Sequence, residues 1–288
     1  MKRFLALMFF AAAAAFAQGP EHLQIAGREV AVWKPQGQSP AGGFPLVLFS
    51  HGLGGCNTQS MFLMEALAQN GYLVLAPNHK DATCAAGDDE RGPGRPQQPL
   101  RDAAQWNDAT YKDRAIDMQA LLDAVLKEKT FAGVAVDGAR IGIAGHSLGG
   151  YTALGLAGGW KSWKDSRIRA VLALSPFVSP FLSKGGLAQI TAPVMYQGGT
   201  RDLGTTPAIK RKDGAYDKTH APKYFVEFEA AGHFAWTNLN KLYQEVISDY
   251  SVAFFDRYLK AQGTPDHLRE LMASPPKIVS QAKADAGK

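Results

Sequence analysis

Short apolar runs alternate with longer stretches of helical periodicity from residue 44 onward. The apolar runs predict strands at residues 44–49, 72–76, 140–144, 168–174, 194–196 and 224–228. Between them, helical periodicity predicts helices at residues 61–69 and 108–129. We also predict a helix of small residues at 147–158 and a final helix at about 239–261. Continuous apolar strands are typical of a parallel sheet that is covered on both faces. We therefore predict a single-domain α/β fold with a mostly parallel central sheet and helices on both faces.

The N-terminal residues have the pattern of a secretory signal peptide. Lys2 and Arg3 precede an apolar run over residues 4–16, and Ala17 closes a small-residue cleavage site. The apolar run is short for a helix that spans a bilayer. We predict a signal peptide at residues 1–17 with cleavage near Ala17, which would make the protein secreted or periplasmic, without stable membrane insertion. A retained N-terminal anchor is the alternative.

The C-terminal residues depart from the alternating pattern. Residues 263–288 are mostly polar, and Pro265 and the Pro275-Pro276 pair interrupt any long helix. We therefore predict one folded domain at residues 18–262, followed by a polar C-terminal tail at residues 263–288.

Composition and charge limit the classes of partner. A chain of 288 residues that is 46% hydrophobic can bury a large core. The formal net charge of +5 is spread along the chain, and its densest group, Lys210, Arg211 and Lys212, is followed by Asp213. Nucleic-acid-binding proteins concentrate basic residues on one face or stripe. We therefore expect no nucleic-acid partner.

The two cysteines, Cys56 and Cys84, both fall in loops that follow predicted strands. An even number of cysteines in an exported protein favours a disulfide. We predict a Cys56–Cys84 disulfide, and two unpaired thiols are the alternative.

The strongest chemical motif is Gly145-His146-Ser147-Leu148-Gly149, which fits the pattern G-x-S-x-G. This pattern requires a sharp turn between a strand and a helix, which exposes the serine hydroxyl above the sheet. The motif here stands between a predicted strand and a predicted helix, as required. We predict that Ser147 is a catalytic nucleophile.

A serine nucleophile needs a base and an acid that orients the base, and in this fold they follow the serine in the order acid, then histidine. His233 comes just after the strand at 224–228, whereas His220 precedes that strand and His267 lies in the predicted tail. Asp202 closes a glycine-rich turn after the strand at 194–196. We predict His233 as the base and Asp202 as the acid.

Other residues remain open for the acid and the surrounding site. Asp213 and Asp217 are the alternative acids. Backbone N–H groups of Leu53 and Leu148 are the expected oxyanion donors, because the first lies in the glycine-rich loop after an early strand and the second follows the nucleophile. Three apolar side chains are candidates for the substrate pocket: Phe177, Phe181 and Trp236.

Together these residues resemble the α/β-hydrolase superfamily. The resemblance is to the branch of dienelactone-hydrolase-like proteins, platelet-activating-factor acetylhydrolases and cutinase-like polyester hydrolases. Its most specific segments are residues 49–54, 145–150 and 232–234, and residues 70–81 look like the acetylhydrolases. Polyester hydrolases usually have an aromatic residue where this chain has Leu53 and a tryptophan where it has Phe177.

We therefore expect a secreted serine carboxylic-ester hydrolase that needs no cofactor and no metal, acting on a small-molecule or oligomeric ester. A polyester or aromatic-ester hydrolase and an amide hydrolase are alternatives on the same triad. From a different class, a non-catalytic hydrolase-fold binding protein is the other alternative.

Overall fold

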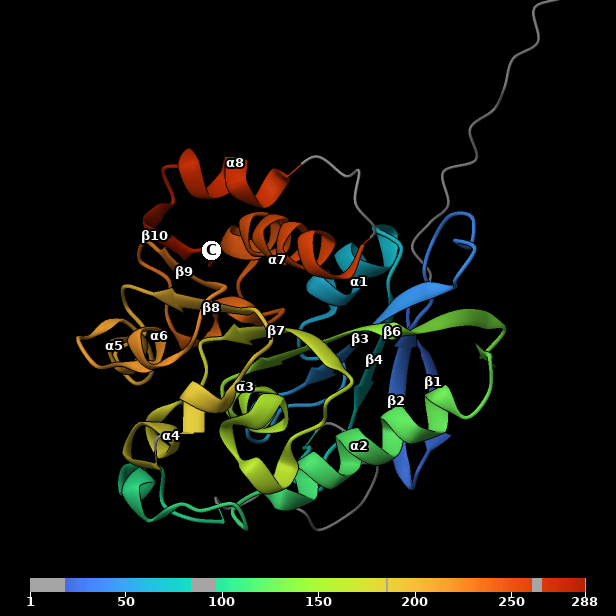
Figure 1. The fold of residues 1–288 in the computed structure, drawn as a ribbon, viewed down its shortest axis with the longest axis horizontal. Helices are drawn as coiled ribbons and strands as arrows, with labels where there is room; N and C mark the ends of the chain where they lie inside the picture. The colour runs from blue at the N-terminus through green and yellow to red at the C-terminus, as the bar shows by residue number, and fades with distance from the viewer. Residues whose placement is uncertain (1–18, 84–96, 185, 261–265, 288) are drawn as a thin grey trace, which may run out of the picture.

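A mixed β-sheet runs through the centre of the computed structural model, which describes residues 19–83, 97–184, 186–260 and 266–287 (Figure 1). Its strands are β1 (Glu21–Ile25), β2 (Arg28–Trp33), β3 (Phe44–Ser50), β4 (Leu73–Pro77), β5 (Thr130–Phe131), β6 (Val134–His146), β7 (Ile168–Leu174), β8 (Val194–Gly199), β9 (Lys223–Phe228) and β10 (Val279–Asp285). The order across the sheet is β1-β2-β4-β3-β6-β7-β8-β9-β10, with β5 beside β6. Neighbours from β4 to β9 are parallel, and the outer strands β1, β2 and β10 pair antiparallel.

Helices cover both faces of this sheet, which confirms the predicted α/β class (Figure 1). One face carries α1 (Met61–Gln69), α7 (Gln244–Leu259) and α8 (His267–Ala273), and the other carries α2 (Lys112–Leu126) and α3 (Leu148–Leu154). Short helices α4 (Ser179–Lys184), α5 (Thr206–Lys210) and α6 (Ala215–Lys218) lie in the connections after β7 and β8. Short 3-10 or π-helical segments are η1 (Leu100–Gln105), η2 (Gly155–Gly159), η3 (Lys161–Trp163), η4 (Gly186–Gln189), η5 (His233–Trp236) and η6 (Lys241–Tyr243).

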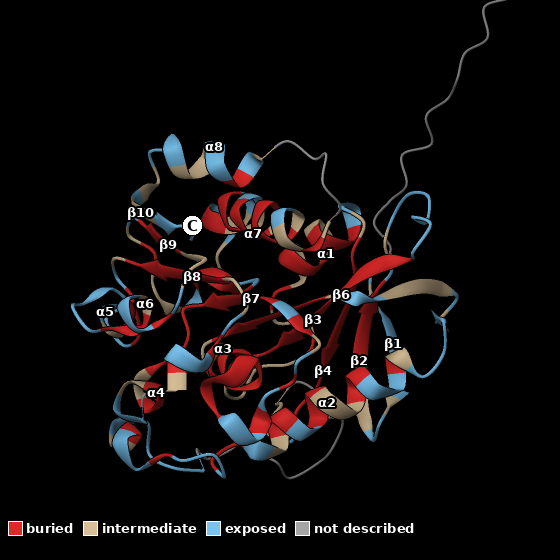
Figure 2. Cartoon of the chain, in the orientation of Figure 1, coloured by how far each residue is buried: buried red, intermediate tan, exposed pale blue. Residues whose placement is uncertain are grey.

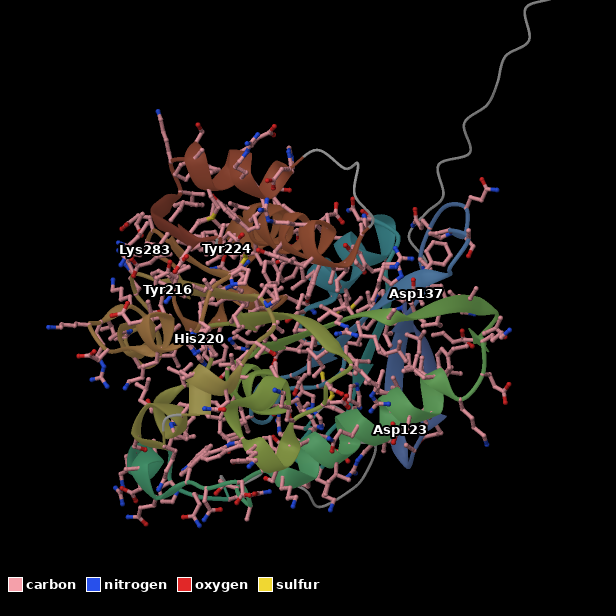
Figure 3. The ribbon with its side chains drawn as sticks, viewed as in Figure 1. Asp123, Asp137, Tyr216, His220, Tyr224 and Lys283 are labelled. Atoms are coloured by element: carbon pink, nitrogen blue, oxygen red, sulfur yellow. The ribbon has the colours of Figure 1, made fainter. Side chains whose placement is uncertain are left out.

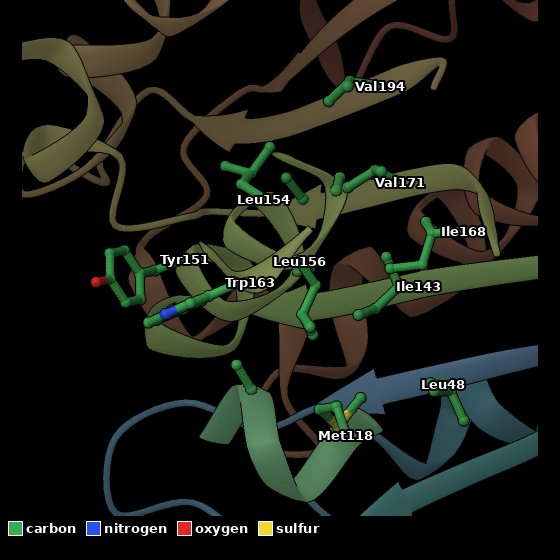
Figure 4. Close-up of a cluster of buried hydrophobic side chains, with 14 of the residues drawn as sticks. Leu48, Met118, Ile143, Tyr151, Leu154, Leu156, Trp163, Ile168, Val171 and Val194 are labelled. Carbon is green, nitrogen blue, oxygen red and sulfur yellow. The ribbon is translucent and has the colours of Figure 1, made fainter. Parts of the chain in front are cut away.

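The sheet separates two hydrophobic cores, because successive side chains of a strand point to opposite faces. In β3, Leu46 and Leu48 belong to the core under α2 and α3, whereas Val47 and Phe49 belong to the core under α1 and α7. The central strands are accordingly buried on both faces (Figure 2). Figure 4 shows part of the first core, where side chains of the sheet meet Met118 of α2.

The C-terminal residues are part of the fold, so the predicted tail at 263–288 is wrong. Strand β10 pairs antiparallel with β9 and forms the last strand of the sheet. In α8, Leu268 is buried in the same core as α7. Strand β10 gives hydrogen-bond partners to the backbone N–H and C=O groups on the outer edge of β9, and this pairing has no signal in the local sequence. The described domain therefore extends to Asp285 rather than ending at residue 262.

The predicted signal peptide, residues 1–17, lies outside the described residues. Among the helices of the described part of the chain, none combines the length and apolar character needed to cross a membrane.

Candidate active site

Ser147 occupies a strained turn between β6 and α3. Its φ of 55° and ψ of −116° place an L-residue in a region that costs about 1–3 kcal/mol. The turn is tight enough that a Cβ on Gly145 would lie 2.2 Å from the carbonyl oxygen of Gly149, and a Cβ on Gly149 would lie 1.8 Å from that of Ser50. The two glycines of the motif are therefore required for the close approach of strand and helix, and the turn leaves Ser147 only partly buried.

The structure brings the side chains of Ser147, His233 and Asp202 together. His233 Nε2 is 2.9 Å from Ser147 Oγ, and His233 Nδ1 is 3.1 Å from Asp202 Oδ1. Ser147 follows β6, Asp202 follows β8 and His233 begins η5 after β9, so all three come from the carboxyl ends of parallel strands. In this geometry Nδ1–H donates to the carboxylate and Nε2 is free to accept the serine proton.

The other histidines weighed for the base lie elsewhere. His220 is exposed, on the side of the molecule that carries α6 (Figure 3). His267 is exposed on α8 and bonds Glu270. Neither ring has a hydrogen bond to Ser147 in the part of the chain that the structure describes.

The carboxylate of Asp202 is buried and receives several hydrogen bonds. Ser175 Oγ and Thr205 Oγ1 both donate to Oδ2, and Thr206 Oγ1 lies 3.2 Å from the same oxygen. Burial by itself would raise the pKa of Asp202, but hydrogen bonds from His233, Ser175 and Thr205 outweigh it and lower that pKa. The group is therefore ionised at neutral pH and can stabilise an imidazolium at His233.

Ser175 is a site residue that the sequence analysis missed. It follows β7 with a φ of 42°, and its Oγ lies 2.8 Å from His233 Nδ1 as well as beside Asp202. Because β7 is the neighbour of both β6 and β8, its carboxyl end lies between those that carry Ser147 and Asp202. That strand order, once known, is the signal that could have identified Ser175.

His146 supports the backbone of His233. Its Nε2 donates to the carbonyl oxygen of His233 at 2.8 Å, and its Nδ1 accepts from Gln59 Nε2 at 3.1 Å. Burial, together with the neighbouring His233, lowers the pKa of His146 to about 3, so the ring is neutral and keeps this donor–acceptor pattern. The pattern G-x-S-x-G leaves this position unspecified, so the motif alone does not indicate the role of His146.

The two expected oxyanion donors lie beside the same pocket as Ser147. Leu53 and Leu148 both line it, together with Ser147 and His233. Among the hydrogen bonds of the described residues, none is donated by the N–H of Leu53 or of Leu148. Both groups are therefore available to a substrate oxygen.

The pocket has a volume of about 530 Å³ and is mainly apolar around the serine. Its lining residues are Leu53, Leu100, Arg101, Ser147, Leu148, Phe177, Arg201, Asp202, Leu203, Gly204, Thr205 and His233. Of the three predicted aromatic residues, Phe177 lines the pocket and its ring packs 4.9 Å from that of Trp106. The sequence analysis missed Leu100, Arg101 and Leu203, which lie in segments without periodicity.

Phe181 and Trp236 do not line the pocket, and their prediction as pocket residues is corrected. Phe181 is fully buried and stacks on Tyr151, with ring centroids 5.0 Å apart. Trp236 is also fully buried, and its indole N–H donates to Gln197 Oε1 at 3.0 Å. Phe181 belongs to the core under α2 and α3, and Trp236 belongs to the core under α1 and α7. An aromatic residue that is close to the site in sequence can pack in a core as well as line a pocket.

Replacing Phe177 with alanine is expected to affect substrate binding, whereas replacing Phe181 with alanine is expected to affect stability. Phe177→Ala removes pocket surface, so we expect KM for a medium-chain ester to rise about tenfold with little change in Tm. Phe181→Ala leaves a cavity in the core and is expected to lower the free energy of unfolding by about 3–5 kcal/mol. Ester kinetics and thermal unfolding of the two variants check this, and equal KM effects would contradict the assignment.

Cys56 is disulfide-bonded and lies in the loop that also carries Leu53. Cys84, its predicted partner, lies outside the described residues. For the described ranges, no three His, Cys, Asp or Glu side chains are grouped closely enough to hold a metal ion.

Comparisons with known proteins identify the family of this chain. The model of the PET hydrolase-like family matches residues 106–284, and that of platelet-activating factor acetylhydrolase, isoform II, matches residues 21–108. Cutinase est2 of Thermobifida alba is 26% identical over 216 residues, which cover 74% of this chain and 59% of the relative. The chain thus spans about 59% of the length of this curated relative. The resemblance to the polyester-hydrolase and acetylhydrolase branch is confirmed, and because the first match covers more than half of the residues, the chain belongs to the PET hydrolase-like family of α/β hydrolases.

Proposed function

We propose that the protein is a secreted serine carboxylic-ester hydrolase that works through a Ser147–His233–Asp202 triad and an acyl-enzyme. The observation that carries the proposal is the 2.9 Å contact between Ser147 Oγ and His233 Nε2, with Asp202 on the other ring nitrogen. Ser147 and His233 line a largely apolar pocket that has room for the acyl or alcohol part of an ester.

The reaction follows from these positions. His233 Nε2 takes the proton of Ser147 as Oγ attacks the ester carbonyl carbon, and the carbonyl oxygen becomes an oxyanion between the N–H groups of Leu53 and Leu148. Collapse of this intermediate breaks the bond to the alcohol, which leaves with the proton from His233. Water then attacks the acyl-enzyme with His233 again as base, and releases the carboxylic acid.

Backbone strain at Ser147 argues against a non-catalytic binding protein. A non-glycine residue at φ 55° is costly, and such strain is typical of active sites. A binding protein could place glycine at this position without that cost. Ester hydrolysis is also the activity named for the family model and the relative, because both names describe polyester hydrolases.

The substrate is proposed to be an ester with an apolar acyl or aromatic part. Leu53, Leu100, Leu148, Phe177 and Leu203 supply the apolar surface of the pocket. Phe177, whose ring lies 4.9 Å from that of the buried Trp106 at an angle of 54°, gives the pocket an aromatic surface, which favours an aromatic group beside the serine.

The proposal is tested with the purified protein on p-nitrophenyl acetate, butyrate, octanoate and palmitate. We expect turnover that peaks at a short or medium chain, together with stoichiometric labelling of Ser147 by a fluorophosphonate probe, read by peptide mass spectrometry. A soluble terephthalate diester and the p-nitroanilide of the best acyl group test the aromatic-ester and amide alternatives. A folded protein that turns over none of these compounds and takes no label would favour the binding role.

A further inference from the structure

The guanidinium of Arg114 lies buried directly under the loop that follows β3. Arg114 belongs to α2 and its side chain is 0% exposed. Nη1 donates to the carbonyl oxygen of His51 at 2.7 Å, and Nη2 donates to that of Gly52 at 3.1 Å. Nε and Nη2 also bind the two carboxylate oxygens of Asp81, at 3.0 and 2.6 Å. One side chain thus joins α2, the loop after β3 and the loop after β4.

The buried ion pair of Arg114 and Asp81 is poorly explained by a contribution to stability alone. Burying two charges carries a desolvation penalty that their attraction offsets only with very good geometry. Burial by itself would raise the pKa of Asp81, but Arg114 overcomes this and holds it at about 2, so the pair stays charged at neutral pH. The neighbouring His51 and His79 have pKa values lowered by burial and by Arg114, so both rings are neutral. Asp81 is therefore the negative partner of the Arg114 guanidinium at neutral pH, and neither neighbouring histidine adds a positive charge.

A second Ser-His-Asp arrangement helps to hold the guanidinium. His79 Nε2 is 2.9 Å from Ser50 Oγ, and His79 Nδ1 is 2.9 Å from Asp117 Oδ2. Ser50 Oγ in turn accepts from Arg114 Nη1 at 3.4 Å. Ser50 and His79 are buried and neither lines the pocket of Ser147, so this arrangement has no route to a substrate there. Through Ser50, these three side chains help to hold the Arg114 guanidinium in place.

The decisive feature is the peptide that joins Gly52 to Leu53. Its carbonyl oxygen accepts from Arg114 Nη2 and, at 2.7 Å, from His51 Nδ1. In a trans peptide the N–H points away from the C=O of the same plane, so fixing the Gly52 carbonyl fixes the direction of the Leu53 N–H. Gly54 N–H donates to Asp81 Oδ2 at 3.3 Å, which holds the following peptide as well.

We infer that Arg114, paired with Asp81, is a positioning residue of the oxyanion hole, which aims the Leu53 N–H at the substrate oxygen. The inference rests on the proposed ester hydrolysis, because an oxyanion forms only in that reaction. Arg114 touches no substrate and acts through the backbone of Gly52 and Leu53. A lysine in its place has three N–H donors and no planar fork, so it cannot reproduce the five hydrogen bonds that Arg114 donates to Asp81, Ser50 and the two carbonyl oxygens.

The test compares Arg114→Lys with Arg140→Lys in the full chain. Arg140 is a matched control, because it also binds a carboxylate and a carbonyl, those of Asp137 and Gly43, each at 2.7 Å. Asp137 lies in β6, far from the strand ends that carry the site (Figure 3). We expect Arg114→Lys to lower kcat about 100-fold with KM within about threefold of the parent, because loss of one oxyanion donor costs about 10²–10³ in rate. Arg140→Lys is expected to keep kcat within about twofold.

A transition-state analogue separates positioning from general loosening. A trifluoromethyl ketone adds to the serine and places an oxyanion in the hole, so its Ki is expected to rise in Arg114→Lys by about the factor by which kcat falls. Equal kcat in the two lysine variants, or an unchanged Ki, would overturn the inference. If Arg114→Lys does not fold, Asp81→Asn carries the same test with an expected tenfold loss. Failure of the proposed function would look different, because the parent protein itself would then show no turnover.

Discussion

The Ser147→Ala protein is expected to hydrolyse p-nitrophenyl butyrate at least about 10⁴-fold more slowly than the parent, while it remains folded. The methyl group cannot attack a carbonyl carbon, and the remaining rate comes only from the oxyanion donors and binding. Alanine at a φ of 55° keeps the strained turn, so we expect the unfolding temperature to stay within a few degrees of the parent value.

This prediction is checked by steady-state kinetics and circular dichroism on both proteins. Ser183→Ala is the matched control, because the Ser183 hydroxyl bonds only the Pro180 carbonyl among the described residues, outside the site. It should keep full activity. Parent-level activity in a folded Ser147→Ala protein would remove Ser147 as the nucleophile.

Asp202→Asn is expected to lower kcat by about 10⁴-fold with a small change in stability. The carboxylate accepts from His233 through one oxygen, and from Ser175 and Thr205 through the other. An asparagine has only one acceptor oxygen, so either His233 or the two hydroxyls must face an NH₂ group. If the amide faces Nδ1, the imidazole is held in the wrong tautomer and Nε2 carries the proton that it should accept.

The controls for this variant come from the alternative acids. Asp213→Asn and Asp217→Asn change exposed residues that are joined to each other by a hydrogen bond from the backbone N–H of Asp213 to Oδ2 of Asp217, so we expect normal kcat in both. Ser175→Ala removes one donor to Asp202 and is expected to cost about tenfold in kcat. Loss of activity in Asp213→Asn with normal activity in Asp202→Asn would reassign the acid.

The positions of the three central side chains could be predicted from the chain because each follows an apolar strand. Parallel strands place their carboxyl ends at one edge, so residues just after β6, β8 and β9 must meet there. Position relative to a strand also separated His233 from His220, which precedes β9. The glycines beside Ser147 marked the turn, since only a residue without Cβ permits so close an approach of strand and helix.

The residues that support the site were not visible in the sequence, because their roles depend on contacts across the fold. Ser175 reaches Asp202, His146 reaches the backbone of His233, and Arg114 reaches the loop after β3 from a helix. A polar residue in a loop or helix carries no local sign of which distant group it will bind. Strand order and loop conformation decide these pairs.

Local sequence thus determined the apolar strands, the helices that cover both faces of the sheet, and the motif that places Ser147 between them. Those features depend on short-range periodicity and on backbone sterics. Only the tertiary structure decided that Phe177 lines the pocket whereas Phe181 and Trp236 fill the cores, and that β10 joins the sheet. Removing an aromatic side chain from water is favourable both in a core and against a bound substrate, so the residue type does not distinguish the two. An edge strand is held by backbone hydrogen bonds to its neighbour and needs little apolar pattern of its own. Packing between distant segments selects between these outcomes.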